Sequence, residues 1–139
     1  IFLLIAIPVV ILFSLLLIPG NAPDEEAHIW QVVALFYRNP AGFDIPKCLL
    51  FQSIPRSYDA LYAQLIAPAS WDIVAPVPRT LSSYWSHLYV VPGIVCALGR
   101  FLNLNVYGTL IAARMVNGLF FVVVSRYLIS LIPVAKQPL

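Results

Sequence analysis

An acidic cluster with a histidine, at residues 23–28, is the part of the sequence best suited to chemistry. Asp24 lies four residues before His28 and Glu25 lies three before it, and on a helix both spacings place the side chains on one face. A carboxylate beside an imidazole suits a general base or half of a metal site. Alternatively, the acids only stabilise the positive end of a helix dipole. The spacing alone favours this second interpretation.

A second group of polar residues interrupts an apolar stretch later in the chain. Arg114 and Asn117 are three apart, so a helix would place them on one face. An arginine at the centre of a bilayer costs at least about 2.5 kcal/mol and usually faces a partner or a wet cavity. Near a helix end it can instead extend to the membrane surface. Spacing leaves both interpretations open.

Arg126 would lie about one bilayer length from Val106, given the rise of a helix. This places it near the opposite surface from the start of the helix, on the same side as the acidic cluster. There it would either anchor the helix at the interface or bind a lipid phosphate.

The composition indicates an all-α integral membrane protein. Of the 139 residues, 61% are apolar and 10% are charged, whereas soluble domains have roughly 45–50% and 25%. The net charge of +2 gives no support for a nucleic-acid partner, so membrane lipid is the expected partner. Both ends of the chain lie at apolar runs, and we expect the N-terminal portion of a larger helical bundle.

Three apolar runs predict three transmembrane helices, at residues 1–19, 84–102 and 106–132. The first run is long enough for a hydrocarbon core of about 30 Å. We expect it to be an uncleaved span, because no basic segment precedes it and residues 19–22 form a poor signal-peptidase site.

Residues 20–83 predict a large extracytoplasmic loop that contains all six acidic residues. A helix near 23–38 should open it, with acids in its first turn and its apolar side on the membrane surface or on other helices. Prolines from residue 40 onward predict turns and extended pieces. The loop is placed outside because Arg100, between the second and third spans, is expected in the cytoplasm.

Two cysteines and two tryptophans complete the candidates. Cys48 lies in the loop and Cys96 well inside the second span, so we expect them not to form a disulfide. Trp30 and Trp71 either stack on a sugar or lie among lipid headgroups.

Three segments resemble an uncharacterised family of multi-spanning bacterial membrane proteins. Residues 22–28 (Ala-Pro-Asp-Glu-Glu-Ala-His) resemble the P-P-D-E-P-A-H-like motif that opens the first loop of that family. Residues 84–92 look like its tyrosine- and proline-rich entry to the next span, and residues 113–117 look like its Arg-x-x-Asn segment. The family is in turn similar to the C-type glycosyltransferases, among them protein O-mannosyltransferases and aminoarabinose transferases.

The resemblance implies a multi-pass protein of the bacterial inner membrane that takes sugar from a polyprenyl-phosphate donor at the outer face. It implies Asp24 as catalytic base, with Glu25 or His28 orienting it or holding the acceptor. Arg126 would then assist the phosphate leaving group.

Arg114 and Asn117 are the remaining candidates for substrate contacts. The alternative is a non-catalytic component, such as a transporter or polymer-export subunit, with these two residues lining a path. The sequence shows no clear ligand set for a metal, so dependence on a divalent cation stays open.

Overall fold

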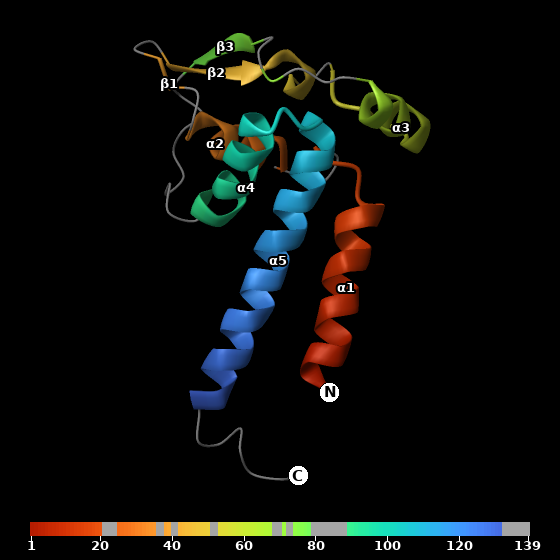
Figure 1. The fold of residues 1–139 in the computed structure, drawn as a ribbon, viewed down its shortest axis with the longest axis vertical. Helices are drawn as coiled ribbons and strands as arrows, with labels where there is room; N and C mark the ends of the chain where they lie inside the picture. The colour runs from red at the N-terminus through yellow and green to blue at the C-terminus, as the bar shows by residue number, and fades with distance from the viewer. Residues whose placement is uncertain are drawn as a thin grey trace.

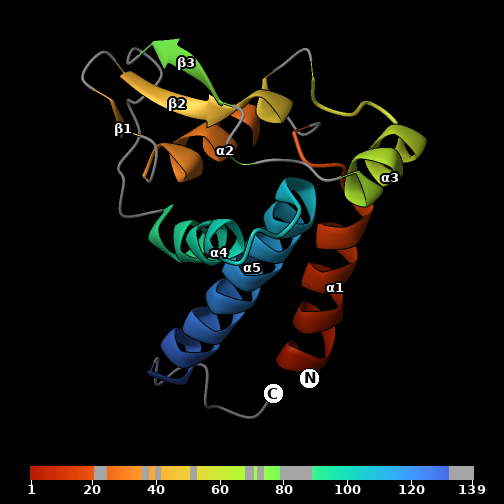
Figure 2. The same cartoon turned by 45° about the horizontal axis from the view of Figure 1, so that its top comes forward.

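The computed structural model describes residues 1–20, 25–35, 38–39, 42–50, 53–67, 71, 74–78 and 89–131. The described part is mostly helical. Two helices, α1 (Phe2–Leu16) and α5 (Val106–Leu131), lie side by side and run in opposite directions (Figure 1). The shorter elements gather around the end of this pair where α1 ends and α5 begins, which we call the loop end (Figure 2).

One helix in the described part of the chain, α5, is long and apolar enough to cross a membrane. Its 26 residues rise about 39 Å, more than the roughly 30 Å of a hydrocarbon core. This agrees with the predicted span 106–132, whose last residue lies outside the described residues. α1 and α4 (Val90–Phe101) are also apolar but shorter, so three membrane-spanning helices are not confirmed.

A glycine permits the close packing of α1 against α5. A Cβ atom added to Gly118 would lie 2.6 Å from Cγ1 of Val10, which is too close for any side chain to fit without a shift. Small residues let helix backbones approach closely where lipid provides no hydrophobic driving force. Ser14, the polar residue of α1, is buried.

α4 differs from the second predicted span, 84–102. Its 12 residues rise only about 18 Å, and residues 84–88 lie outside the described part. The residue before it, Tyr89, contacts His28 of the loop. The turn after it is also held by the loop, because Trp71 Nε1 donates to the Leu104 carbonyl at 2.8 Å. Both ends of α4 therefore lie at the loop end.

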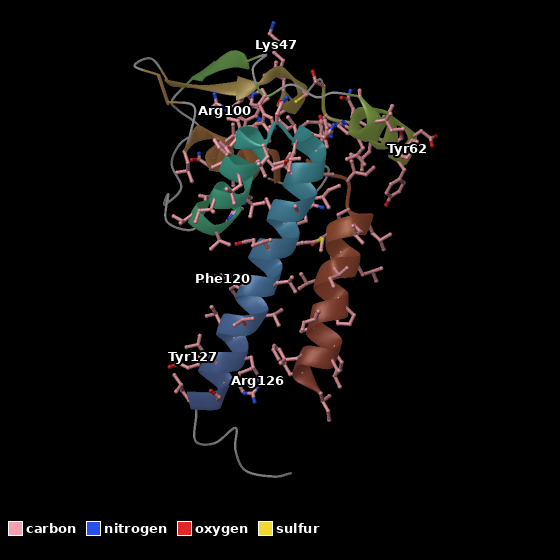
Figure 3. The ribbon with its side chains drawn as sticks, viewed as in Figure 1. Lys47, Tyr62, Arg100, Phe120, Arg126 and Tyr127 are labelled. Atoms are coloured by element: carbon pink, nitrogen blue, oxygen red, sulfur yellow. The ribbon has the colours of Figure 1, made fainter. Side chains whose placement is uncertain are left out.

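This arrangement changes the expected position of Arg100 relative to the loop. Arg100, in the last turn of α4, lies at the same end as the loop instead of across the membrane from it (Figure 3). The assignment of the loop to the outside rested on Arg100 being opposite it, and that reason is removed. Asn103 turns the chain back with a φ of 51°, a conformation that asparagine tolerates better than most residues.

The loop contains a small sheet that the all-helical prediction omitted. Among the described residues, β1 (Arg38–Asn39), β2 (Gly42–Pro46) and β3 (Val74–Pro78) pair antiparallel in the order β1-β2-β3. The prolines disfavour helix there and leave extended backbone, as predicted for this part of the loop.

The predicted helix near 23–38 is shorter in the structure. α2 spans Glu25–Ala34, and Arg38 already pairs with Phe43 in the sheet. Ile29 and Val33 of α2 are buried in the core, against the 3₁₀ helix η1 (Lys47–Leu49), strand β2 and α4. Of the two alternatives expected for this helix, the structure shows the second, in which it packs on other elements of the chain.

Both tryptophans have structural roles. Trp71 is 1% exposed and bonds to the turn before α5, while Trp30 Nε1 donates to the Leu49 carbonyl at 2.9 Å. The ring of Trp71 is buried and therefore not open for stacking on a sugar, whereas Trp30 is partly buried. Cys48 and Cys96 are free thiols, as predicted.

Candidate functional site

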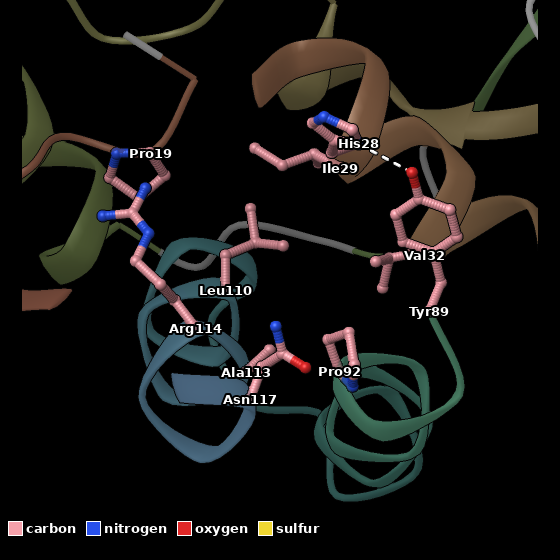
Figure 4. A pocket seen from close by; sticks show the side chains of 10 residues that line it. All are labelled: Pro19, His28, Ile29, Val32, Tyr89, Pro92, Leu110, Ala113, Arg114 and Asn117. Carbon is pink, nitrogen blue, oxygen red and sulfur yellow. Dashed lines mark hydrogen bonds between the residues drawn. The ribbon is translucent and has the colours of Figure 1, made fainter. Parts of the chain in front are cut away.

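A cavity of about 340 Å³ lies at the loop end between α2, α4 and α5 (Figure 4). It brings together three residues that the sequence singled out from distant segments: His28, Arg114 and Asn117. Its walls are mainly apolar. The complete lining is Pro19, His28, Ile29, Val32, Tyr89, Pro92, Leu110, Ala113, Arg114 and Asn117.

His28 enters the cavity from α2 and contacts Tyr89, just before α4. Nδ1 of His28 and the Tyr89 hydroxyl lie 2.7 Å apart, and the tautomer of the ring decides which of them donates. The exposed histidine thus meets a buried tyrosine. The sequence pointed to Tyr89 only as part of the tyrosine- and proline-rich segment 84–92, and no spacing rule relates two residues so far apart in the chain.

Arg114 reaches from α5 to the C-terminal end of α1. Its Nη1 donates to the Leu17 carbonyl at 2.5 Å and to the Ser14 carbonyl at 3.5 Å. Carbonyls at a helix C-terminus lack partners inside the helix and carry the negative end of its dipole. Arg114 therefore faces a polar partner within the protein, and its half-buried guanidinium stabilises the end of α1 while lining the cavity.

Asn117 lies one helical turn beyond Arg114, on the same side of α5 as predicted. Its side chain is exposed and lines the cavity together with Pro92 of α4 (Figure 4). The two residues lie in the half of α5 nearer the loop. They form one wall of the cavity and do not mark a path along the whole helix.

The remaining predicted site residues are placed differently. Asp24 lies outside the described residues, directly before α2. Glu25 is the first residue of α2, and its side chain is outside the described part. Arg126 is exposed near the far end of α5 (Figure 3), 12 residues and therefore about 18 Å beyond Arg114.

The predicted position of Arg126, on the side of the acidic cluster, is thus wrong. That prediction required α4 to cross the membrane, so that α5 would end on the side of the loop. Because α4 begins and ends at the loop end, α5 starts there and carries Arg126 away. Arg126 does not belong to this cavity.

The described residues contain no group of three histidine, cysteine or acidic side chains placed to hold a metal ion. Cys48 lies in η1, and burial raises the pKa of its thiol to about 11. Its thiol is therefore protonated at neutral pH, a poor state for a metal ligand or nucleophile.

The cavity combines apolar walls with a few polar groups. A guanidinium, an imidazole, a phenol and an amide converge on a space bounded by leucine, isoleucine, valine and proline side chains. Guanidinium groups bind phosphate oxygens through paired donors, and apolar walls favour hydrocarbon. Such a site suits an amphiphile with an anionic head.

No protein-family model, curated protein or solved structure matches this chain. The resemblance to glycosyltransferases of the membrane therefore stays a prediction from the three sequence segments.

Proposed function

We propose that this chain is part of a membrane glycosyltransferase that uses a polyprenyl-phosphate sugar as donor. The observation that supports the proposal is the meeting of His28, Arg114 and Asn117 in one cavity at the loop end. We assign the cavity to the phosphate and the first isoprenyl units of the donor. Arg114 would contact the phosphate, and Leu110 and Val32 would contact the hydrocarbon.

The proposed setting is the bacterial inner membrane, with α1 and α5 as antiparallel members of a multi-pass bundle. The apolar, largely exposed side chains of both helices support it. We place the loop end at the outer surface, where a lipid-linked donor presents its sugar. α4 then enters the bilayer from that side and does not cross it. A membrane tolerates such a segment where protein surrounds the ends of the helix.

The proposed chemistry uses Asp24 as base. Asp24 directly precedes α2, and His28, four positions later in the chain, lies at the cavity. Its carboxylate would take the proton of the acceptor hydroxyl as that oxygen attacks the anomeric carbon. The bond from this carbon to the phosphate oxygen breaks, and polyprenyl phosphate leaves with the electron pair. Arg114 would stabilise the charge that develops on the phosphate.

Sugar transfer tests the proposal. Membranes containing the full-length protein would be supplied with polyprenyl-phosphate mannose, glucose or aminoarabinose, and transfer of label from the lipid measured. Asp24→Asn should lower the rate by about 10²–10⁴-fold, as loss of a general base does. Asp59→Asn is the matched control, because Asp59 lies in the first turn of α3 (Tyr58–Ile66) and does not line the cavity. Equal rates for wild type and Asp24→Asn would refute Asp24 as base.

A non-catalytic lipid-binding or export subunit is the second candidate. It is favoured by the hydrogen bonds of Arg114 to the end of α1, which give this arginine a structural reason to be present. It is also favoured by the distance of Arg126 from the cavity. Binding of polyprenyl phosphate without transfer from any donor, in the full-length protein, would support this candidate over the enzyme.

A further inference from the structure

α3 presents a row of exposed aromatic and apolar side chains. Tyr58, Tyr62 and Ile66 are 60%, 67% and 67% exposed, and their spacing of four residues places them along one side of the helix. On the neighbouring side, Leu61 is buried and Leu65 packs against the core. Side chains this large and apolar are rarely left in water as a continuous row.

Hydrogen bonds fix α3 to the loop end of both long helices. The Tyr58 hydroxyl donates to the Leu16 carbonyl in the last residue of α1. Asn105 Nδ2, just before α5, donates to the carbonyls of Gln64 at 2.7 Å and Ala67 at 2.8 Å. α3 is therefore held at the level where α1 ends, and the position of its exposed row is determined.

The exposed row continues an apolar surface. Leu16 and Leu17, at the end of α1, are 53% and 43% exposed, and Tyr58 bonds directly to this segment. In Figure 3, Tyr62 lies on the outer side of α3, beside the end of α1 and away from α4. Among the described residues, the exposed apolar surface of α1 thus lies next to the exposed row of α3.

We propose that α3 lies in the headgroup region of the same bilayer that surrounds α1, with Tyr58, Tyr62 and Ile66 in contact with lipid. Tyrosines favour this depth because the ring is apolar and the hydroxyl is wet. Helices with one apolar side lie in this plane with that side buried among the headgroups and upper acyl chains. We therefore assign the position at the membrane surface to α3 and not to the helix expected near 23–38. α3 then marks the membrane boundary near Leu17.

Site-directed fluorescence tests the position of α3. In a background with Cys48→Ala and Cys96→Ala, Tyr62→Cys would carry an environment-sensitive label in vesicles of phosphatidylcholine and phosphatidylglycerol. Ala60→Cys is the matched control, since Ala60 is also exposed but lies about 160° away around the helix. Quenching is measured with iodide in the water and with nitroxide lipids labelled near the headgroup. Ile66→Cys provides a second, independent position on the row.

The proposal expects opposite behaviour on the two sides of α3. Labels at residues 62 and 66 should be quenched severalfold more by nitroxide lipids than the label at 60, which iodide should quench instead. Equal quenching by iodide at all three positions would overturn the proposal. Protection of residues 62 and 66 from both quenchers would overturn it as well, because protein would then cover the row. Neither result depends on the contents of the cavity.

Discussion

Arg114 shows how one residue serves both the fold and the candidate site. Its guanidinium binds the carbonyls of Leu17 and Ser14 and lines the cavity. Because the guanidinium is hydrogen-bonded to the end of α1, its positive charge is held beside the apolar walls of the cavity. The effect of a mutation at Arg114 on stability must therefore be measured before its effect on ligand binding.

We expect Arg114→Gln to lower the free energy of unfolding by about 1–2 kcal/mol, because the negative end of the α1 dipole loses a cation and a carbonyl loses a charged donor. Arg114→Lys should retain part of the stabilisation, since lysine keeps the positive charge but lacks the planar, forked guanidinium. Thermal unfolding in detergent measures both. Arg126→Gln is the control and should change stability by no more than about 0.5 kcal/mol, as exposed substitutions do. Equal stability of Arg114→Gln and Arg126→Gln would contradict the capping role.

At the residue scale, the sequence predicted the site in part. Residue type and helical spacing were enough to pair Arg114 with Asn117 and to single out His28. Tyr89 could not be found this way, because its contact with His28 joins segments 61 residues apart. The sequence also could not show that Arg114 binds the end of α1, since that contact depends on the packing of two distant helices.

At the scale of elements, the packing of α1 on α5 depends on the absence of a side chain at Gly118. Gly118→Leu should destabilise the protein by about 1–3 kcal/mol, as overpacking does. Val10→Ala in the same chain should recover part of that loss, because Val10 is the residue that the new side chain meets. Unfolding of both single variants and the double variant measures this coupling.

Gly108→Ala is the matched control for this contact. A Cβ atom at Gly108 would have its nearest neighbour 3.8 Å away, an ordinary contact, so the change should be neutral or slightly stabilising. Additive effects of Gly118→Leu and Val10→Ala would contradict the proposed close contact between α1 and α5.

Element lengths explain which predictions failed. α5 follows its apolar run closely, and the helix continues through Arg114, Asn117 and Arg126. The second run, 84–102, is also apolar, but α4 occupies only its later part. The bonds of Leu104 and Asn105 to Trp71, Gln64 and Ala67 return the chain to the loop. Hydropathy gives the length of an apolar run, but it contains no information on the contacts that hold the ends of the run in the fold.

At the scale of the whole molecule, the structure places the loop and the turn between α4 and α5 at one end. Asp59→Cys in α3 and Asn103→Cys in the turn should therefore react with a membrane-impermeant thiol reagent from the same side of sealed vesicles. The same Cys48→Ala, Cys96→Ala background removes the native thiols. Reaction of the two positions from opposite sides would restore the three-span topology predicted from the sequence and contradict the structure.

The proposed function depends on the cavity binding a lipid phosphate, and native mass spectrometry with added polyprenyl phosphate tests this most directly. Asn117→Phe should fill the cavity from an exposed position, so folding is preserved while lipid is excluded. Val116→Phe adds the same ring one residue away, at a position that is exposed and does not line the cavity. We predict bound lipid on wild type and Val116→Phe, with loss of most of it on Asn117→Phe. Equal lipid binding by all three proteins would contradict the assignment of the cavity.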